Sequence, residues 1–315
     1  MAEANTILVP VDFSSHARAA ALRACHLAAV SGGRLRLLHA LDLPALAKRR
    51  GLGEALFEEL RESESQQLDE LVSSLAPHGV PIVACLEERE PVEMILEHAA
   101  DESVELIVMG SHGYRGLDRI FLGSVAERTI REAPVPVVTV KENEWDAAAR
   151  IRRILLATDF SQDSARALDE TIRWGGRLGA DVEVLHVIPA VGAVERRGEG
   201  EVRTAEARRR EALASLQAVL EQMRSEGISA VASLSHGAPS IEIAKRAARI
   251  GAELIVVGRR GRSQLAGVVC GSVSDRVQRH AKCSVLLAPR TTRHEDLRGR
   301  RGAALHAAVR EAALV

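Results

Sequence analysis

The stretch ILVPVDFS, residues 7–14, decides the fold, because the chain repeats it as ILLATDFS at residues 154–161. Each copy is a short apolar run followed by an aspartate and, two residues later, a serine. Such a run is typical of a strand buried in a parallel sheet, and the two polar residues are typical of the turn and N-cap that start a helix. Asp12 and Asp159 are therefore equivalent residues, and the repeat predicts two similar domains.

Further segments repeat in the same order along the chain. RLLHAL at residues 36–41 returns as EVLHVI at 183–188, and ELIVMGSHG at 105–113 returns as ELIVVGRRG at 253–261. Within each copy, short apolar runs alternate with segments of helical period. This alternation predicts an α/β fold, a parallel sheet with helices on both faces, in each domain.

The predicted domains extend over residues 1–142 and 150–290. The segment between them, around residues 141–153, is charged and has no apolar period, as is typical of a solvated linker. Residues 291–315 form a C-terminal tail with a basic start and an alanine-rich end. We expect this tail to be a short docking helix or a frayed terminus rather than a nucleic-acid-binding segment.

The composition argues against several classes of partner. The 315 residues carry a formal net charge of −1 and 2% of them are aromatic, which disfavours an electrostatic or stacking surface for nucleic acid. No apolar run reaches the length of a membrane span, and the first residues lack the pattern of a signal peptide. The four cysteines show no CxxC or zinc-like spacing, as expected of reduced thiols. We therefore predict a cytoplasmic protein that binds neither nucleic acid nor membrane.

A glycine-rich loop follows the apolar run LIVM or LIVV of each domain. Its pattern is G-x-x-G-x9-G-S, from Gly110 to Ser124 in the first domain and from Gly258 to Ser272 in the second. Paired glycines let backbone N–H groups turn toward an anion, and the helix that starts at Gly-Ser adds N–H donors. The spacing thus predicts a phosphate-binding loop, although the Gly-Lys-Ser/Thr ending of a P-loop is absent. The alternative is that the glycines serve only tight turns and close helix–strand packing.

The sequence resembles the universal stress proteins in their tandem, two-domain form, over residues 5–290. The resemblance rests on ILVPVDFS, the glycine pattern, the segment SVAERTIREAPVPVVTV at residues 124–140, and their counterparts in the second half. It implies a five-stranded parallel sheet of strand order 3-2-1-4-5 in each domain, and it implies the ATP-binding branch of the family. By the same resemblance, Asp12 and Gly110 face each other at the switch point between the first and fourth strands.

The resemblance carries the family's nucleotide pocket onto both domains, position by position. The Asp12 carboxylate would accept from ribose hydroxyls, the backbone of Ala40 would meet the adenine edge, and the loop would hold ribose and phosphates. The implied residues of the first domain are Pro10, Val11, Asp12, Ala40, Gly110, Ser111, His112, Gly113, Gly123, Ser124 and Val125. Those of the second domain are Ala157, Thr158, Asp159, Val187, Gly258, Arg259, Arg260, Gly261, Gly271, Ser272 and Val273.

Four residues near the predicted pocket allow more than one interpretation. His39 and His186 stand at equivalent strand ends, where a structural histidine is favoured over a catalytic base. Arg259 and Arg260 lie inside the second glycine loop. They are either solvated charges or contacts to phosphate.

The resemblance implies an ATP-binding regulator of a stress or dormancy response, in which nucleotide occupancy alters a surface read by a protein partner that the sequence does not identify. It also implies a homodimer, and whether Mg²⁺ accompanies ATP stays open. The motifs contain no P-loop lysine and no evident pair of metal-positioning carboxylates. We therefore expect no catalytic residue, no dedicated metal site and at most very slow hydrolysis. The alternatives are a slow ATPase or phosphotransferase and an interaction scaffold with empty pockets.

Overall fold

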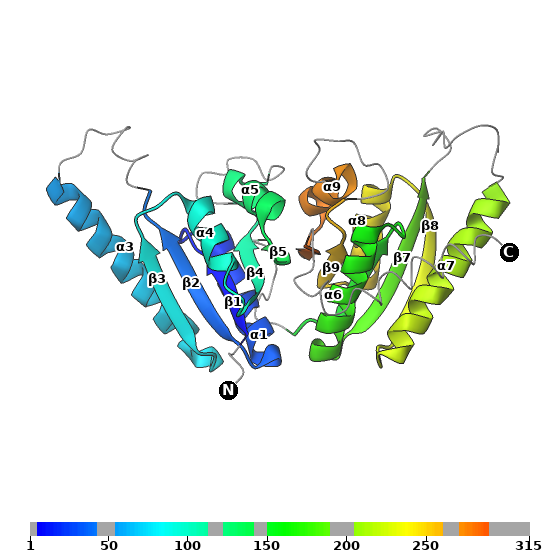
Figure 1. Cartoon of the computed structure of the whole chain (residues 1–315), viewed down its shortest axis with the longest axis horizontal. Coiled ribbons are helices and arrows are strands. Elements are labelled where there is room, and N and C mark those ends of the chain that lie inside the picture. Colours follow the sequence, from blue (N-terminus) through cyan, green and yellow to red (C-terminus); the bar gives the residue numbers. More distant parts are fainter. Residues whose placement is uncertain are drawn as a thin grey trace. The chain divides into compact units, whose positions relative to one another are not determined.

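Each half of the chain folds into an α/β unit in the computed structural model (Figure 1). The structure describes residues 5–42, 54–112, 122–141, 150–189, 205–260 and 271–289. The chain divides into two units, Met1–Arg150 and Ile151–Val315. The predicted tail at residues 291–315 lies outside the described residues.

The first unit alternates strands and helices. In chain order its elements are β1 (Thr6–Pro10), α1 (Ser15–Ser31), β2 (Arg34–Ala40), α3 (Glu54–Leu75), the 3₁₀ turn η1 (Ala76–His78), β3 (Ile82–Glu87), α4 (Pro91–Ala99), β4 (Val104–Gly110), α5 (Ser124–Glu132) and β5 (Val137–Val140). The strands are parallel, and their order across the sheet is β3-β2-β1-β4-β5. The strand order 3-2-1-4-5 is therefore confirmed in this unit.

The second unit repeats the arrangement with equivalent elements. They are β6 (Arg153–Thr158), α6 (Gln162–Leu178), β7 (Asp181–Pro189), α7 (Ala205–Ser225), β8 (Ala230–Gly237), α8 (Pro239–Ile250), β9 (Leu254–Val257), α9 (Ser272–His280) and β10 (Ser284–Leu287). The strands are again parallel, in the order β8-β7-β6-β9-β10. The two units therefore have one topology, as the sequence repeat predicts.

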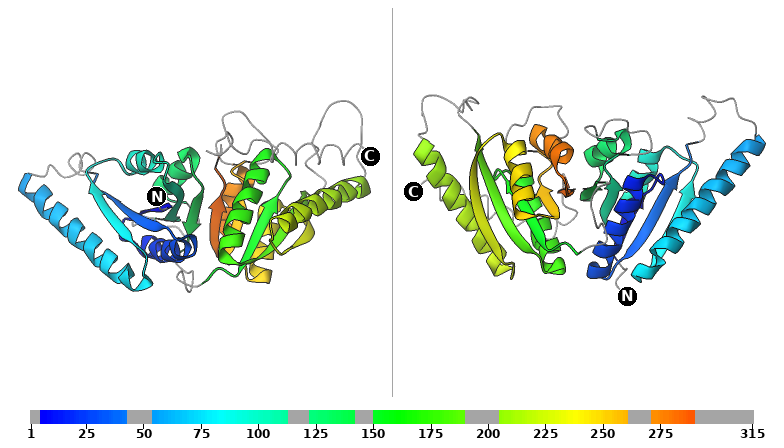
Figure 2. Two further views of the ribbon diagram at one scale, coloured as in Figure 1. Left: turned by 60° about the horizontal axis from the view of Figure 1, so that its bottom comes forward. Right: turned by 180° about the vertical axis from the view of Figure 1, so that it is seen from behind.

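Helices cover both faces of each sheet. In the first unit α1 and α3 pack on one face, and α4 and α5 pack on the other (Figure 2). The central strands are consequently buried on both sides, with Leu8 of β1 and Ile255 of β9 fully excluded from solvent. Continuous burial explains why these strands read as apolar runs rather than as an alternation of apolar and polar residues.

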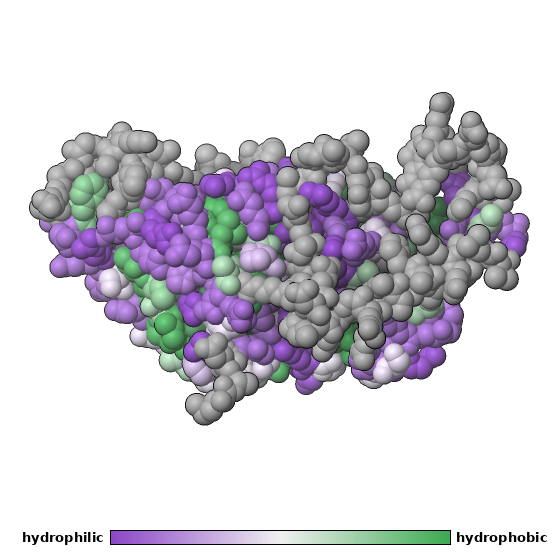
Figure 3. Space-filling model, in the orientation of Figure 1, coloured by the Kyte–Doolittle hydropathy of each residue, from purple (hydrophilic) through white to green (hydrophobic). Residues whose placement is uncertain are grey.

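The face of the molecule that is drawn in Figure 3 is mainly hydrophilic. The face drawn in Figure 3 shows apolar residues only in small separate areas. Large apolar side chains that are exposed include Val83 on β3 and Val231 on β8, which are equivalent positions on the edge strands. No helix within the described ranges is both long enough and apolar enough to cross a membrane.

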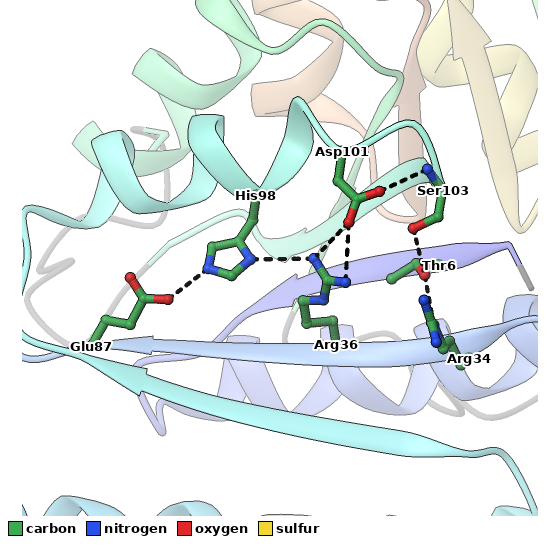
Figure 4. A network of polar contacts seen from close by, with 7 residues as sticks. All are labelled: Thr6, Arg34, Arg36, Glu87, His98, Asp101 and Ser103. Carbon is green, nitrogen blue, oxygen red and sulfur yellow. Dashed lines mark hydrogen bonds and ion pairs between the residues drawn. The ribbon is translucent and has the colours of Figure 1, made fainter. Parts of the chain in front are cut away.

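A chain of polar contacts links β2, β3 and the end of α4 in the first unit (Figure 4). Arg36 donates to Asp101 Oδ2 at 3.3 Å and lies 3.3 Å from His98 Nδ1. His98 Nε2 in turn lies 2.7 Å from Glu87 Oε1. Asp101 also accepts from the backbone N–H of Ser103 at 2.9 Å, and hydrogen bonding by Ser103 is the main cause of the lowered pKa of Asp101. The network ties α4 to the sheet.

The second unit carries the opposite charge at the place of Arg36. Glu183 of β7 accepts from Arg246 Nε at 2.5 Å and from Arg246 Nη2 at 3.1 Å. Ser233 Oγ donates to the same carboxylate at 2.5 Å. In each unit, a charged side chain at this position of the second strand therefore contacts the helix that packs beside it.

Candidate functional site

The candidate site of each unit lies at the carboxyl edge of the sheet. β1 pairs with β2 on one side and with β4 on the other, so the connections leave β1 and β4 in opposite directions there. Asp12 follows β1 and Gly110 ends β4, and both therefore stand at this switch point. Asp159 and Gly258 stand at the equivalent point between β6 and β9.

The aspartate after the first strand is held by the start of the next helix. Asp12 Oδ1 accepts from Ser14 Oγ at 2.6 Å and from the Ser14 N–H at 3.2 Å. Ser14 is also the N-cap of α1 and accepts from the N–H of Ala17 at 3.2 Å. The Asp12 residue is exposed, and the serine fixes its carboxylate at the edge of the sheet.

Asp159 is held in a similar way in the second unit. Its Oδ1 atom accepts from Ser164 Oγ at 2.5 Å and from the Ser161 N–H at 3.1 Å. Ser161 is the N-cap of α6. The turn-and-cap role that the sequence predicts for D-F-S is thus found in both units.

Between the aspartate and the serine, each unit places a phenylalanine with left-handed backbone. Phe13 has φ of 59° and Phe160 has φ of 60°, values that bulky residues rarely adopt. Each ring stacks on a histidine, Phe13 on His39 and Phe160 on His186, with centroids 4.5 Å apart in both cases. These phenylalanines are not among the predicted site residues, although the repeat of D-F-S is a sequence signal that marks them.

The two histidines bind backbone carbonyls below the site. His39 Nδ1 lies 2.8 Å from the carbonyl oxygen of Val11, and its Nε2 lies 3.2 Å from Glu64 Oε2. His186 Nδ1 lies 2.8 Å from the carbonyl oxygen of Thr158. These bonds tie the end of the second strand to the end of the first, which supports the structural interpretation of both histidines.

The glycine loop of the first unit returns to its starting point. The N–H of Gly123 donates to the carbonyl of Ser111 at 3.0 Å, and the N–H of Ser111 donates to the carbonyl of Val140 at 2.9 Å. Ser111 is fully buried, and its Oγ atom lies 3.0 Å from His112 Nδ1. The start of α5 therefore lies beside the end of β4. Gly113 lies outside the described residues.

The loop of the second unit closes through the same backbone contact. The N–H of Gly271 donates to the carbonyl of Arg259 at 2.9 Å, and Ser274 Oγ donates to the same carbonyl at 2.9 Å. Arg259 is fully buried, so it is not a solvated surface charge, whereas Arg260 is half-buried. Gly261 lies outside the described residues.

Both loops lead into a helix whose N-cap has no side chain. Gly123 and Gly271 are the N-caps of α5 and α9, and neither helix has a side-chain capping bond. The first N–H groups of a helix lack partners within the helix and carry a partial positive charge. Ser124 and Ser272 are exposed at these starts. The helix starts therefore suit an anionic ligand.

The first glycine of each pattern has a packing role. A Cβ atom on Gly110 would lie 2.8 Å from His16 Cβ and 3.0 Å from the His16 carbonyl carbon. A Cβ atom on Gly258 would lie 2.7 Å from the carbonyl carbon and oxygen of Asp163. Gly110 and Gly258 therefore have the role that the sequence offered as the alternative to phosphate binding, which is close packing of a helix against a strand.

The remaining predicted residues line the same edge. Pro10 ends β1, Val11 is buried next to it, and Ala40 lies beyond the β1–β2 ladder, which ends at Pro10 and Leu38. Their equivalents are Ala157, Thr158 and Val187. Val125 is half-buried in α5 and Val273 is exposed in α9.

Within the described residues, no group of three or more histidine, cysteine, aspartate or glutamate side chains is placed to hold a metal ion.

The sequence of each unit matches a known family. The profile of the universal stress protein family matches residues 3–141 and again residues 150–289. The chain belongs to the universal stress protein family. Because the profile matches twice, the chain is a tandem member of that family.

Relatives of known name agree with this assignment. A universal stress protein of Mycolicibacterium smegmatis is 26% identical over 290 residues, which cover 89% of this chain and 96% of the relative. A universal stress protein of Thermus aquaticus is 37% identical over 140 residues, which cover 44% of this chain and 98% of the relative. The crystal structure of a universal stress protein from Archaeoglobus fulgidus has a TM-score of 0.72 at 23% identity, covering 91% of this chain and 99% of that chain. The tandem organisation and the fold are thus shared with other universal stress proteins.

Proposed function

We propose that each unit binds an adenine nucleotide at the carboxyl edge of its sheet, and that the chain is an ATP-binding regulator of a stress or dormancy response. The observation that carries the proposal is the closure of both loops. Gly123 donates to Ser111, and Gly271 donates to Arg259, at 3.0 Å and 2.9 Å. Each bond brings a helix start without a side-chain cap to the switch point of its sheet.

The groups at this edge match the parts of a nucleotide. Helix N-termini and glycine-loop amides favour phosphate groups. The carboxylates of Asp12 and Asp159 are fixed by serines and suit the hydroxyls of a ribose. The backbone of Ala40 and of Val187 lies where the first strand has ended and can meet the edge of a base.

The proposed role is binding rather than turnover. Nucleotide occupancy changes the surface of the loops at this edge, and a protein partner reads that surface. We further propose that the protein acts in the cytoplasm as a homodimer. If Mg²⁺ accompanies ATP, it would reach the site with the nucleotide.

Equilibrium titration of the full chain with ATP tests the proposal. We expect one nucleotide per unit. Ser124→Asp and Ser272→Asp each place a carboxylate at an exposed helix start and should each abolish one site. A chain that binds no nucleotide under any condition would favour the interaction scaffold. Hydrolysis near the usual enzyme range, on the order of 1–10³ s⁻¹, would favour the ATPase alternative.

A further inference from the structure

His16 and Asp163 are one of the pairs of equivalent residues at which the two sites differ. Both lie in the first turn of the helix that follows the first strand of their unit. In both units this turn touches the glycine that starts the loop, because a Cβ on Gly110 or on Gly258 would lie within 3.0 Å of its backbone. The backbone packing is the same, so the side chains of His16 and Asp163 approach the two loops from the same place.

In the second unit, this side chain is an anion bound to the loop. Asp163 Oδ2 accepts from the backbone N–H of Arg260 at 2.8 Å, and Asp163 Oδ1 accepts from Arg166 Nη1 at 2.7 Å. The side chains of Asp163 and Arg166 are 19% and 11% exposed. Arg166 therefore orients the largely buried carboxylate of Asp163 so that this carboxylate accepts a hydrogen bond from a backbone N–H of the glycine loop.

In the first unit, the equivalent contact joins two histidine rings. The ring of His16 packs on the ring of His112, which is the equivalent of Arg260, with centroids 5.1 Å apart. An imidazole does not repel a phosphate, whereas a carboxylate does. Between the described residues, the first loop thus contacts this helix through a pair of imidazole rings.

We propose that Asp163 is an internal anion that takes the place of phosphate on the second loop and gives the second site a lower affinity for nucleotide polyphosphates than the first. Successive amides of a glycine-rich loop bind anions, and one of them is already bound to this carboxylate. A phosphate that takes the Arg260 N–H must displace Asp163, and otherwise it binds without that amide, beside the ion pair of Asp163 and Arg166. The inference rests on the proposed nucleotide sites, and it predicts that the second site discriminates by ligand charge.

The test measures each site in the full chain with the other one blocked. In the Ser124→Asp background, which leaves the second site, Asp163→His should tighten ATP binding about tenfold, a difference of roughly 1.4 kcal/mol. Adenosine has no phosphate, and its affinity should change less than about twofold by the same charge argument. In the Ser272→Asp background, which leaves the first site, His16→Asp should weaken ATP binding by a similar factor.

Two further variants separate charge from fold. Asp163→Asn keeps an oxygen that can accept from Arg260 and loses only the charge, so it should reproduce part of the gain in ATP affinity. Asp169→Asn removes an exposed charge from the same helix and should leave ATP affinity unchanged. Thermal unfolding of every variant confirms that the units remain folded.

The outcomes distinguish this inference from the proposed function. The inference is supported if the affinity for ATP rises in Asp163→His while the affinity for adenosine does not. This holds even if the second site of the unsubstituted chain binds no measurable ATP. ATP bound equally at both sites, with no response to either substitution, overturns the inference alone. Weaker ATP binding in Asp163→His also overturns it, because the carboxylate would then assist the nucleotide or its metal ion. Absence of binding in all variants overturns both proposals.

Discussion

His39 Nδ1 lies 2.8 Å from the carbonyl oxygen of Val11, and this bond joins the end of β2 to the end of β1 beneath the candidate site. The geometry requires the proton on Nδ1, because a carbonyl can only accept. Glu64 stands at the other ring nitrogen, 3.2 Å from Nε2. His39 therefore positions the backbone that carries Asp12.

Replacing His39 by phenylalanine should destabilise the first unit. His39→Phe keeps a ring against Phe13 but removes the donor to the Val11 carbonyl, and losing the partner of a buried polar group costs about 1–3 kcal/mol. Urea denaturation should show this loss, and His186→Phe should show a similar one in the second unit. Glu64→Gln is the control, since it leaves the bond to Val11 in place. Unchanged stability in both histidine variants would contradict the structural role.

A methyl group at the first loop glycine should also destabilise the fold. Gly110→Ala would place Cβ 2.8–3.0 Å from the backbone and Cβ of His16, and Gly258→Ala would meet the backbone of Asp163 at 2.7 Å. Such overpacking typically costs about 1–3 kcal/mol. Gly176→Ala in α6 is the control, because its Cβ would meet Ile228 Cδ1 at an ordinary 3.5 Å. If Gly110→Ala and Gly258→Ala both have the free energy of unfolding of the unsubstituted chain, these glycines are not required for packing.

Cys25 should be inert in the folded chain and should make stability depend on alkaline pH. Burial raises the pKa of the Cys25 thiol to about 11. The folded state therefore holds a proton that the unfolded state releases near its ordinary pKa, so the free energy of unfolding falls as pH rises from about 9 to about 11. Cys25→Ala should reduce this slope. Alkylation followed by mass spectrometry at pH 8 should modify Cys25 only after unfolding, and modification of the native chain would contradict its burial.

The ion pair between Glu183 and Arg246 in the second unit offers a double-mutant test. Arg246→Met leaves Glu183, whose side chain is 7% exposed, without its cation. Because Arg246 itself is partly solvated, we expect a loss of about 1–3 kcal/mol rather than that of a fully buried pair. Adding Glu183→Met should restore most of the loss in chemical denaturation. A double variant as unstable as Arg246→Met alone would show that the side chains contribute through packing and not through charge.

The sequence by itself determined the repeat, the order of strands and helices and the location of the glycine loops. These features depend on local patterns: an apolar run of strand length, an N-cap serine, a glycine at a loop start. The resemblance based on the same residues supplied the strand order 3-2-1-4-5, which the structure confirms in each unit. It also indicated Asp12 and Asp159, and the structure shows the serines that hold each carboxylate.

Only the tertiary structure decided what individual residues at the site do. The burial of Arg259 and the left-handed backbone of Phe13 have no distinct signal in the sequence, and packing of Gly110 was one of two interpretations that the sequence allowed. The contact between Asp163 and Arg260 joins residues 97 positions apart. Such contacts depend on how closely two segments approach after folding and on which side chain stands at the point of approach, whereas the periodicity of a sequence reports only which face of one segment is buried.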